Sequence, residues 1–312
     1  MQLPIYDCAK DILAALRERK SLIVRAPTGS GKSTQVPQMM LDSGLFSGQI
    51  LVLQPRRLAA RMLAARVAEE RGSALGAEIG FQTRFETLVS PETRVRFITE
   101  GILPRMLLSN RDLSGVSAVV FDEFHERSLA TDVGLALVKD LQAVSRMDLC
   151  MIVMSATIDV APVAAYLGSP AIIESAGRVF PIDMRYSSSM PSVKTAVWDM
   201  AASAASSLIA AGAEGDILVF MPGAYEIRRT VDALERSVRS ESVAVMPLYG
   251  DLPADRQRRV MEHLTRRKII VATNIAETSL TIPGVRQVID SGLARISRYD
   301  PGRGFNTLFT EP

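Results

Sequence analysis

Short, uninterrupted apolar runs recur along this chain, and segments with helical periodicity separate them. In the first half these runs are LIVRA (22–26), ILVLQP (50–55), VRFIT (95–99), SAVVFDE (117–123) and LCMIVMSAT (149–157). A strand covered on both faces is apolar throughout, whereas a strand with one solvated face alternates. Between these runs lie patterns such as RRLAARMLAARVAEERG (56–72), which ends at a glycine typical of a helix C-cap. Strands of this kind alternating with helices predict an α/β fold with a doubly wound parallel sheet.

A composition break at about 168–192 separates two such alternations. It contains Gly, Pro and a serine run around one strand-like segment, FPIDMRY (180–186). The alternation of strands and helices then restarts. We expect helices over 193–212, beginning at about 224, and over 253–264. The expected strands are 216–221, 242–250, 268–273 and 285–290. We therefore expect two tandem domains, over 1–176 and 177–312. The last segment, with turn residues DPGRG (300–304) between ARISRY and FNTLFT, predicts a β-hairpin.

Composition bounds the class of protein. The chain has 312 residues, of which 47% are hydrophobic, enough for two cores. Its net charge is only +2, so any nucleic acid must be bound by a local groove and not by a basic tail. Its two cysteines have no metal-binding spacing. Because the sequence contains neither a signal-peptide core nor eighteen consecutive apolar residues, we expect a soluble cytoplasmic protein without a membrane segment.

The segment APTGSGKS (26–33) directly follows the first expected strand and opens a helix. Glycines at these positions let backbone N–H groups surround phosphate oxygens at a helix N-terminus. Lys32 would reach the β- and γ-phosphates, and the Ser33 hydroxyl would bind Mg²⁺. An ordinary glycine-rich turn is the alternative, which the strand–helix context disfavours. The residues expected to bind nucleotide here are Thr28, Gly29, Ser30, Gly31, Lys32, Ser33 and Thr34.

Two adjacent carboxylates, Asp122 and Glu123, end a hydrophobic strand. In a chain with a phosphate-binding loop, Asp122 is expected to hold Mg²⁺ through water. Glu123 is expected to orient and deprotonate the attacking water, because phosphoryl transfer needs a metal, a positioned nucleophile and charge stabilisation. The alternative is a solvated helix start, which would be preferred for a lone Asp-Glu pair. The expected catalytic residues are thus Lys32, Asp122, Glu123 and, from the resemblance below, His125.

Several further motifs follow in a fixed order: QPRRLAARMLAARVAEE, RFITEGILPRML, DEFHERS, MSAT, LVFMPGAYEI, PLYGDL and TNIAETSLTIPGV. Together with the loop they resemble the superfamily-2 helicases of the DEAH/RNA-helicase-A class, most closely the HrpB-like branch, whose DEFH variant explains Phe124 as a packing residue. The resemblance implies two RecA-like domains with a nucleotide cleft between them. It also implies ATP and Mg²⁺ as cofactors, and single-stranded or duplex nucleic acid, RNA in preference to DNA, as partner. The sequence leaves the oligomeric state open, and we favour a monomer.

The resemblance implies roles for residues around the nucleotide. His125 would couple the γ-phosphate to Ser155 and Thr157, although a helix cap or a core hydrogen-bonding group is an alternative reading of this histidine. Arg66 would stack on the base of the nucleotide. Met261 stands where family members usually have an aromatic residue for the other face of that base, which weakens the expected sandwich.

The same resemblance implies a surface for the nucleic acid strand. Hydroxyls, amides and isolated arginines suit contacts to phosphate and sugar, which carry no sequence information. The matching residues are Arg56, Arg84, Thr99, Thr273 and Asn274, although Arg84 or Thr99 alone would be interpreted as a surface residue or a cap. Thr278 and Ser279 match positions that sense nucleotide across the cleft. The terminal hairpin would be a wedge at the duplex junction, or else an edge hairpin that closes the sheet.

The family's arginine-rich sixth motif should follow the hairpin, but the sequence ends at Pro312 before it. An arginine finger is worth roughly 10³–10⁵ in rate. The expectation is therefore either that this is a fragment with an incomplete second domain, or that it hydrolyses ATP slowly. The leading hypothesis is the motor core of an ATP-dependent helicase with 3′→5′ translocation. The alternative is a nucleotide-gated nucleic-acid-binding module with little turnover.

Overall fold

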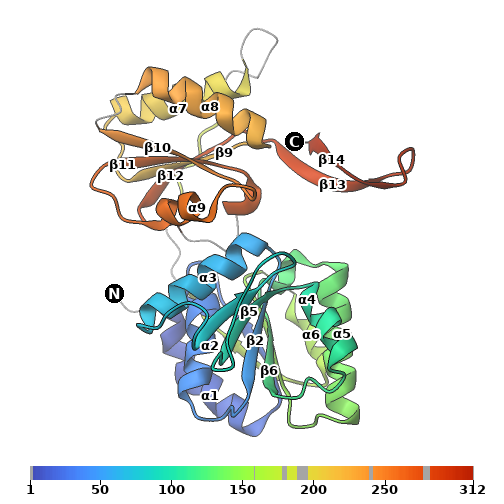
Figure 1. The fold of residues 1–312 in the computed structure, drawn as a ribbon. Helices are drawn as coiled ribbons and strands as arrows, with labels where there is room; N and C mark the ends of the chain where they lie inside the picture. The colour runs from blue at the N-terminus through green and yellow to red at the C-terminus, as the bar shows by residue number, and fades with distance from the viewer. Residues whose placement is uncertain are drawn as a thin grey trace. The chain divides into compact units, whose positions relative to one another are not determined.

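The computed structural model describes residues 3–157, 159–177, 181–187, 196–238, 242–276 and 282–311. They divide into two compact units, Met1–Pro181 and Ile182–Pro312. Each unit contains a parallel sheet with helices on its faces (Figure 1). Among the described residues, no helix combines the length and apolar character needed to cross a membrane.

The first unit is built on an eight-stranded sheet with the order β4-β3-β5-β2-β6-β7-β1-β8. Its strands are β1 (Ser21–Arg25), β2 (Gln49–Gln54), β3 (Ile79–Gln82), β4 (Thr87–Leu88), β5 (Val95–Thr99), β6 (Val116–Phe121), β7 (Cys150–Ser155) and β8 (Ala171–Glu174). All neighbours are parallel except β3 and β4. The expected doubly wound parallel sheet is therefore confirmed.

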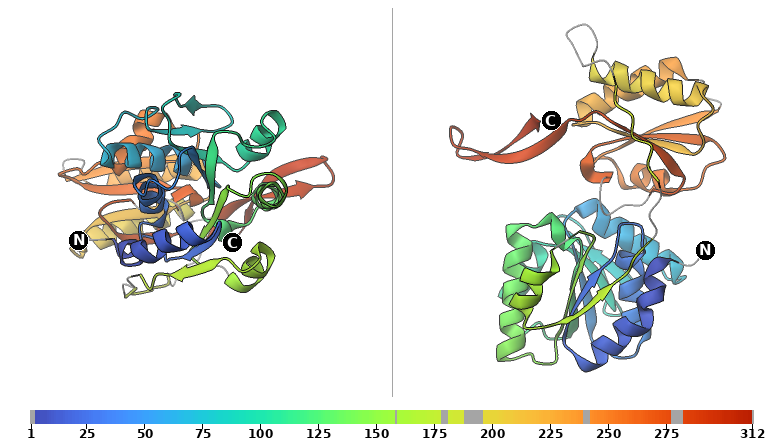
Figure 2. Two further views of the ribbon diagram at one scale, coloured as in Figure 1. Left: turned by 90° about the horizontal axis from the view of Figure 1, so that it is seen from below. Right: turned by 180° about the vertical axis from the view of Figure 1, so that it is seen from behind.

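Helices cover both faces of this sheet (Figures 1 and 2). The helical elements are η1 (Pro4–Cys8), α1 (Ala9–Glu18), α2 (Lys32–Asp42), α3 (Arg57–Glu70), α4 (Ile102–Ser109), η2 (Phe124–Glu126), α5 (Leu129–Val144) and α6 (Val160–Leu167). One core contains residues of α1, α2 and α3, and the other contains residues of α4, α5 and α6. The strands between the two cores are covered on both sides, which explains their uninterrupted apolar sequence.

The second unit has a four-stranded parallel sheet with the order β10-β11-β9-β12. Its elements are α7 (Val197–Ala210), β9 (Asp216–Phe220), α8 (Ala224–Ser237), β10 (Val243–Leu248), α9 (Ala254–Met261), β11 (Arg267–Ala272), η3 (Asn274–Ala276) and β12 (Val285–Asp290). Its core joins residues of α7 and α8 to β9 and β11.

The predicted terminal hairpin is present as β13 (Ala294–Asp300) and β14 (Phe305–Glu311). It forms a two-stranded sheet of its own and extends away from the four-stranded sheet (Figure 1). The alternative that it closes the larger sheet is therefore wrong.

Two sequence-based expectations about strands need correction. The segment 181–187 contains no strand, and all of its residues are exposed, so no sheet covers them; Phe180 lies outside the described residues. Conversely, β3, β4 and β8 were not expected. They have at most four residues each, and β8 alternates in burial at the sheet edge, so none of them has the long apolar run that identifies a central strand.

Candidate nucleotide site and nucleic-acid surface

Three neighbouring strands carry the motifs of the first unit. The loop 26–31 follows β1, the acidic pair follows β6, and Ser155 is the last residue of β7. The strands are parallel and lie in the order β6-β7-β1, so their carboxyl ends meet at one edge of the sheet. This edge is where open α/β sheets bind ligands.

The phosphate-binding loop has the backbone that its glycines predict. Gly29 and Gly31 have φ values of +75° and +93°, in the left-handed region. A Cβ on Gly31 would lie 2.8 Å from Leu3 Cδ1, so a larger residue would clash there. Helix α2 begins at Lys32, and the first N–H groups of a helix have no partner within it. The loop therefore presents donors suited to phosphate oxygens.

Other loop residues expected to bind nucleotide differ in exposure. Thr28 is exposed, whereas Ser33 and Thr34 are half-buried in the first turn of α2. The Thr34 hydroxyl donates to the Gly31 carbonyl at 3.3 Å. Ser30 is buried, and its hydroxyl has no hydrogen-bond partner among the described residues. Such a buried polar atom is normally satisfied by water or ligand.

Lys32 and Glu123 form a buried ion pair at the centre of this edge. The Lys32 Nζ atom lies 3.1 Å from Glu123 Oε1, and both side chains are at most 4% exposed. Burial and, secondarily, the charge of Asp122 raise the pKa of Glu123 to about 7, although Lys32 acts in the opposite direction. The other oxygen, Glu123 Oε2, has no hydrogen-bond partner among the described groups. Glu123 is thus a buried carboxyl group whose pKa is close to neutral pH, as suits a general base.

Asp122 is held from two sides. The Glu123 N–H donates to its Oδ1 at 2.9 Å, and the Gln54 side-chain amide donates to its Oδ2 at 2.5 Å. Gln54 is fully buried at the end of β2, the neighbour of β6. Sequence reasoning missed Gln54, although a single amide at the end of the apolar run ILVLQ was a signal, because buried polar groups normally have a partner.

His125 lies between the acidic pair and β7. Its Nδ1 atom is 3.3 Å from the Ser155 hydroxyl and 3.5 Å from Glu123 Oε2. Burial, followed by the positive charge of Lys32, lowers the pKa of His125, which favours the neutral imidazole. Ser155 is fully buried, whereas Thr157 is exposed. The histidine therefore connects the loop after β6 to the end of β7.

The side chains at this edge fit a magnesium ion that is bound mainly by phosphate oxygens. Ser33 and Asp122 offer a hydroxyl and a carboxylate, the oxygen ligands that Mg²⁺ prefers. No group of three or more His, Cys, Asp or Glu side chains within the described ranges could form an all-protein cage. Mg²⁺ in nucleotide sites uses one or two protein ligands together with phosphate oxygens and water, so two protein oxygens suffice.

Arg66 is connected to helix α2 through Glu70. Its Nε donates to Glu70 Oε1 at 2.8 Å, and Gln35 and Gln38 donate to Glu70 Oε2 at 2.8 and 2.9 Å. The pKa of Glu70 is lowered because these three hydrogen bonds outweigh the opposing effect of burial. The Arg66 side chain remains 60% exposed, so its guanidinium has an accessible surface for stacking.

The residues expected to contact nucleic acid lie at strand ends in both units. In the first unit, Arg56 follows β2, Thr99 ends β5, and Arg84 lies in the turn after β3. These strands are neighbours in the sheet. The Arg56 Nε atom lies 3.4 Å from Glu126 Oε2. In the second unit, half-buried Thr273 and exposed Asn274 follow β11.

Three remaining positions belong to the second unit or fall outside the described residues. Met261 is half-buried at the end of α9. Thr278 and Ser279 lie outside the described residues.

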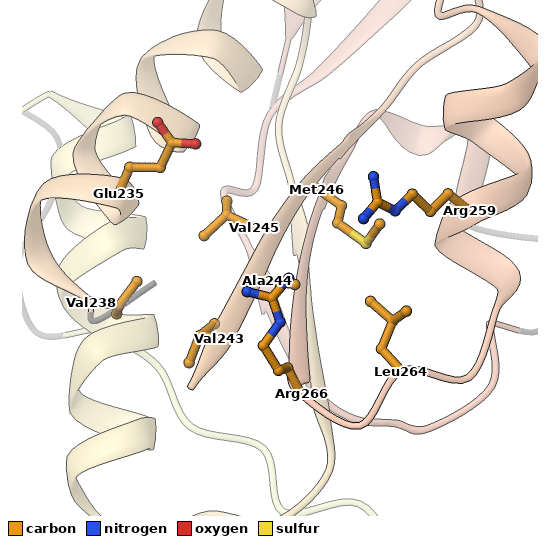
Figure 3. Close-up of a pocket in the computed structure, with 9 residues that line it drawn as sticks. All are labelled: Glu235, Val238, Val243, Ala244, Val245, Met246, Arg259, Leu264 and Arg266. Atoms are coloured by element: carbon orange, nitrogen blue, oxygen red, sulfur yellow. The ribbon is translucent and has the colours of Figure 1, made fainter. Parts of the chain in front are cut away.

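A cavity of about 250 Å³ lies beside β10, an edge strand of the second sheet, and is lined by residues of α8, β10, α9 and the α9–β11 turn (Figure 3). None of the residues expected at the site lines that cavity.

Comparison with known proteins agrees with this architecture. The DEAD/DEAH box helicase model matches residues 6–165, and the helicase conserved C-terminal domain model matches residues 201–301. The chain is 40% identical over 311 residues to the ATP-dependent RNA helicase HrpB of Escherichia coli (strain K12), covering 99% of this chain and 38% of HrpB. It is 40% identical over 313 residues to the ATP-dependent RNA helicase HrpA of the same organism, covering 99% of this chain and 24% of HrpA.

A crystal structure of the Escherichia coli DEAH/RHA helicase HrpB matches 99% of this chain and 39% of its own, with a TM-score of 0.90 and 39% sequence identity. The two units are therefore tandem RecA-like domains. The chain spans well under half the length of the curated relatives it matches. From the family models, the relatives and the fold together, the chain belongs to the DEAD/DEAH-box helicases, in their HrpB-like branch.

Proposed function

We propose that this chain is the motor core of an ATP-dependent RNA helicase. It couples nucleoside triphosphate hydrolysis to movement along nucleic acid and to strand separation, with an ATP-binding domain over 1–176 and a second helicase domain over 177–312. The relatives are named ATP-dependent RNA helicases, which supports RNA as the substrate. The observation that carries the proposal is the buried contact between Lys32 and Glu123 at the end of three adjacent parallel strands.

The proposed chemistry assigns one task to each of these side chains. Ser33 and Asp122 would hold Mg²⁺ together with the triphosphate, and the bound ion would supply charge neutralisation for the transferred phosphoryl group. Lys32 leaves Glu123 to bind phosphate oxygens, because the triphosphate carries more negative charge than one carboxylate. Glu123 then orients the attacking water and accepts its proton. His125 couples the bound γ-phosphate to Ser155, and through Ser155 to the end of β7.

The strand of nucleic acid is proposed to follow the ends of β2, β3 and β5 in the first unit and of β11 in the second. Arg56, Arg84, Thr99, Thr273 and Asn274 would contact its phosphates and sugars. Such contacts fix position without reading sequence, which suits a motor that must step along any strand.

Glu123→Gln tests this function because the amide keeps the size of the side chain but cannot act as a base. We expect turnover to fall at least about 100-fold, the usual contribution of a general base, while nucleotide binding persists. Lys32→Ala should lose nucleotide binding and turnover together. Both are measured by ATP hydrolysis with and without a polynucleotide and by direct nucleotide titration. Glu92→Gln, at an exposed loop position, is the matched control and should be unchanged.

Two results would contradict the proposed motor function. Unchanged turnover in Glu123→Gln would remove this residue from its proposed role. Nucleic-acid binding that depends on ATP, combined with negligible hydrolysis by the unaltered chain, would support the alternative of a nucleotide-gated binding module.

A further inference from the structure

An aromatic ring is exposed at the tip of the turn between β3 and β4. The Thr83 N–H and hydroxyl both donate to the Glu86 carbonyl, at 2.7 and 3.3 Å, which leaves Arg84 and Phe85 in the centre of the turn. Turn centres usually hold Gly, Asn, Asp or Ser. Phe85 is 74% exposed in this position. A single exposed hydrophobic residue needs no explanation by itself, but this ring has charged neighbours.

Two guanidinium groups lie against this ring. The Cζ atoms of Arg57 and Arg84 are 5.5 and 5.2 Å from the Phe85 ring centroid, within the range of cation–π contacts. Arg61 of α3 lies 3.6 Å from Glu86 of the same turn. The turn is therefore held against the first turns of α3, yet most of the ring surface remains accessible.

The cluster of Phe85, Arg57 and Arg84 lies near residues that are proposed to contact the nucleic acid strand. Strand β3 pairs with β5, and β5 pairs with β2, all in parallel. The turn after β3 thus lies at the same edge of the sheet as Thr99 and Arg56, two of the residues proposed to contact the strand. An exposed aromatic ring among arginines is the combination by which proteins bind single-stranded nucleic acid without sequence preference.

We propose that Phe85 is a stacking platform for one unpaired base of single-stranded nucleic acid, and that the guanidinium groups of Arg57 and Arg84 contact the flanking phosphates. This inference rests on the proposed function, because the bound strand is the one that the motor follows. Every base has a flat apolar face, so the platform adds affinity without choosing a sequence.

The test compares two strands of equal length: an oligouridine RNA and an abasic ribose-phosphate strand. Phe85→Leu keeps an apolar side chain but removes the aromatic face. We expect it to weaken oligouridine binding by about 5- to 140-fold, the loss that corresponds to one base–aromatic stack. Binding of the abasic strand should be unchanged, and Phe85→Trp should restore the oligouridine affinity.

Salt dependence and a matched control separate stacking from other roles. The slope of log K against log salt should be the same in Phe85→Leu as in the unaltered chain, because the phosphate contacts remain. Tyr166→Leu is the matched control, because it removes another half-exposed ring that contacts a cation, Lys139. Tyr166 lies in α6, between β7 and β8, and β8 is at the opposite end of the sheet from β3 and β4. This variant should leave binding of both nucleic acid strands unchanged.

Equal weakening on both strands, with a shallower salt slope, would overturn the proposal, because Phe85 would then only position the arginines. Unchanged affinity for oligouridine in Phe85→Leu would also overturn it. If the unaltered chain bound neither strand, the proposed function itself would fail, and that result is distinct because it requires no variant.

Discussion

Glu123 has a left-handed backbone conformation, with φ 50° and ψ 37°. A non-glycine residue in this region costs of order 1–3 kcal/mol, and such strain tends to occur at functional sites. Here the conformation ends β6 abruptly, and the Glu123 carboxylate meets Lys32. A buried carboxylate in a strained backbone, beside a second carboxylate, reduces stability, and this combination is the one expected of a functional site.

At the residue scale, Gln54→Leu tests how Asp122 is held. The leucine fills similar space but removes the hydrogen bond to Asp122 Oδ2. Loss of a group that orients a metal ligand typically costs 10–100-fold, so we expect a reduction of about that size in turnover and a higher Mg²⁺ requirement. Both are measured by ATP hydrolysis across a Mg²⁺ titration.

Gln49→Leu is the matched control at the other end of β2, where the amide donates to the Thr93 carbonyl at 2.9 Å. It should leave the Mg²⁺ dependence unchanged. A normal Mg²⁺ dependence in Gln54→Leu would show that Asp122 keeps its orientation without the amide.

At the element scale, the second unit depends on a buried lysine where several elements begin or end. Lys268, at the start of β11, is 2% exposed. Its ammonium donates to the Val260 and Glu262 carbonyls at the end of α9 and to the Pro283 carbonyl before β12. It also lies 3.4 Å from Asp216 Oδ2 at the start of β9. One charge therefore satisfies carbonyls of two connections and one carboxylate.

Lys268→Met should lower the free energy of unfolding by about 3–5 kcal/mol, because it removes the cation beside the Asp216 carboxylate and leaves several carbonyls without their donor. Asp216 keeps only the hydrogen bond from the backbone N–H of position 268, at 2.7 Å. Chemical denaturation provides the measurement. Arg286→Met breaks the exposed pair with Glu214 in the same unit and should cost at most about 1 kcal/mol. An equal, small effect of both variants would mean that the buried contacts of Lys268 are replaceable.

At the scale of the whole molecule, the two units have separate hydrophobic cores. The chain's single tryptophan, Trp198, lies in α7 of the second unit. Its ring contacts Tyr225 at 5.8 Å between centroids, in an edge-on arrangement. Tryptophan fluorescence therefore reports the unfolding of the second unit, whereas calorimetry reports both.

We expect MgATP to raise the unfolding transition of the first unit more than that of the second. A ligand at 100 times its Kd stabilises the state that binds it by about 2.7 kcal/mol. The calorimetric transition should shift with nucleotide while the fluorescence transition moves less, and Lys32→Ala should abolish the shift. An equal shift of both signals would indicate that the two units unfold together.

Much of the fold could be predicted from sequence because its signals are local. The runs that became β1, β2, β5, β6 and β7 are mostly apolar, without strict alternation, and were expected within a residue or two of their bounds. The short strands β3, β4 and β8 lack that signal. The strand expected in FPIDMRY (180–186) is absent from its described residues, 181–186, which are all exposed, so no neighbouring strand or helix covers them.

The sequence by itself determined the order of strands and helices along the chain, the division into two α/β domains and the phosphate-binding loop, because apolar periodicity and glycine conformations act over a few residues. The RecA-like character of the domains was implied by the resemblance of the motifs to a known family. Only the tertiary structure decided that Lys32 meets Glu123, 91 residues later, and that Gln54 holds Asp122 across adjacent strands. It also decided that Phe85 lies among arginines. The order of strands within each sheet, the desolvation of Glu123 and the resulting pKa of Glu123 depend on packing between distant segments, which no local pattern contains.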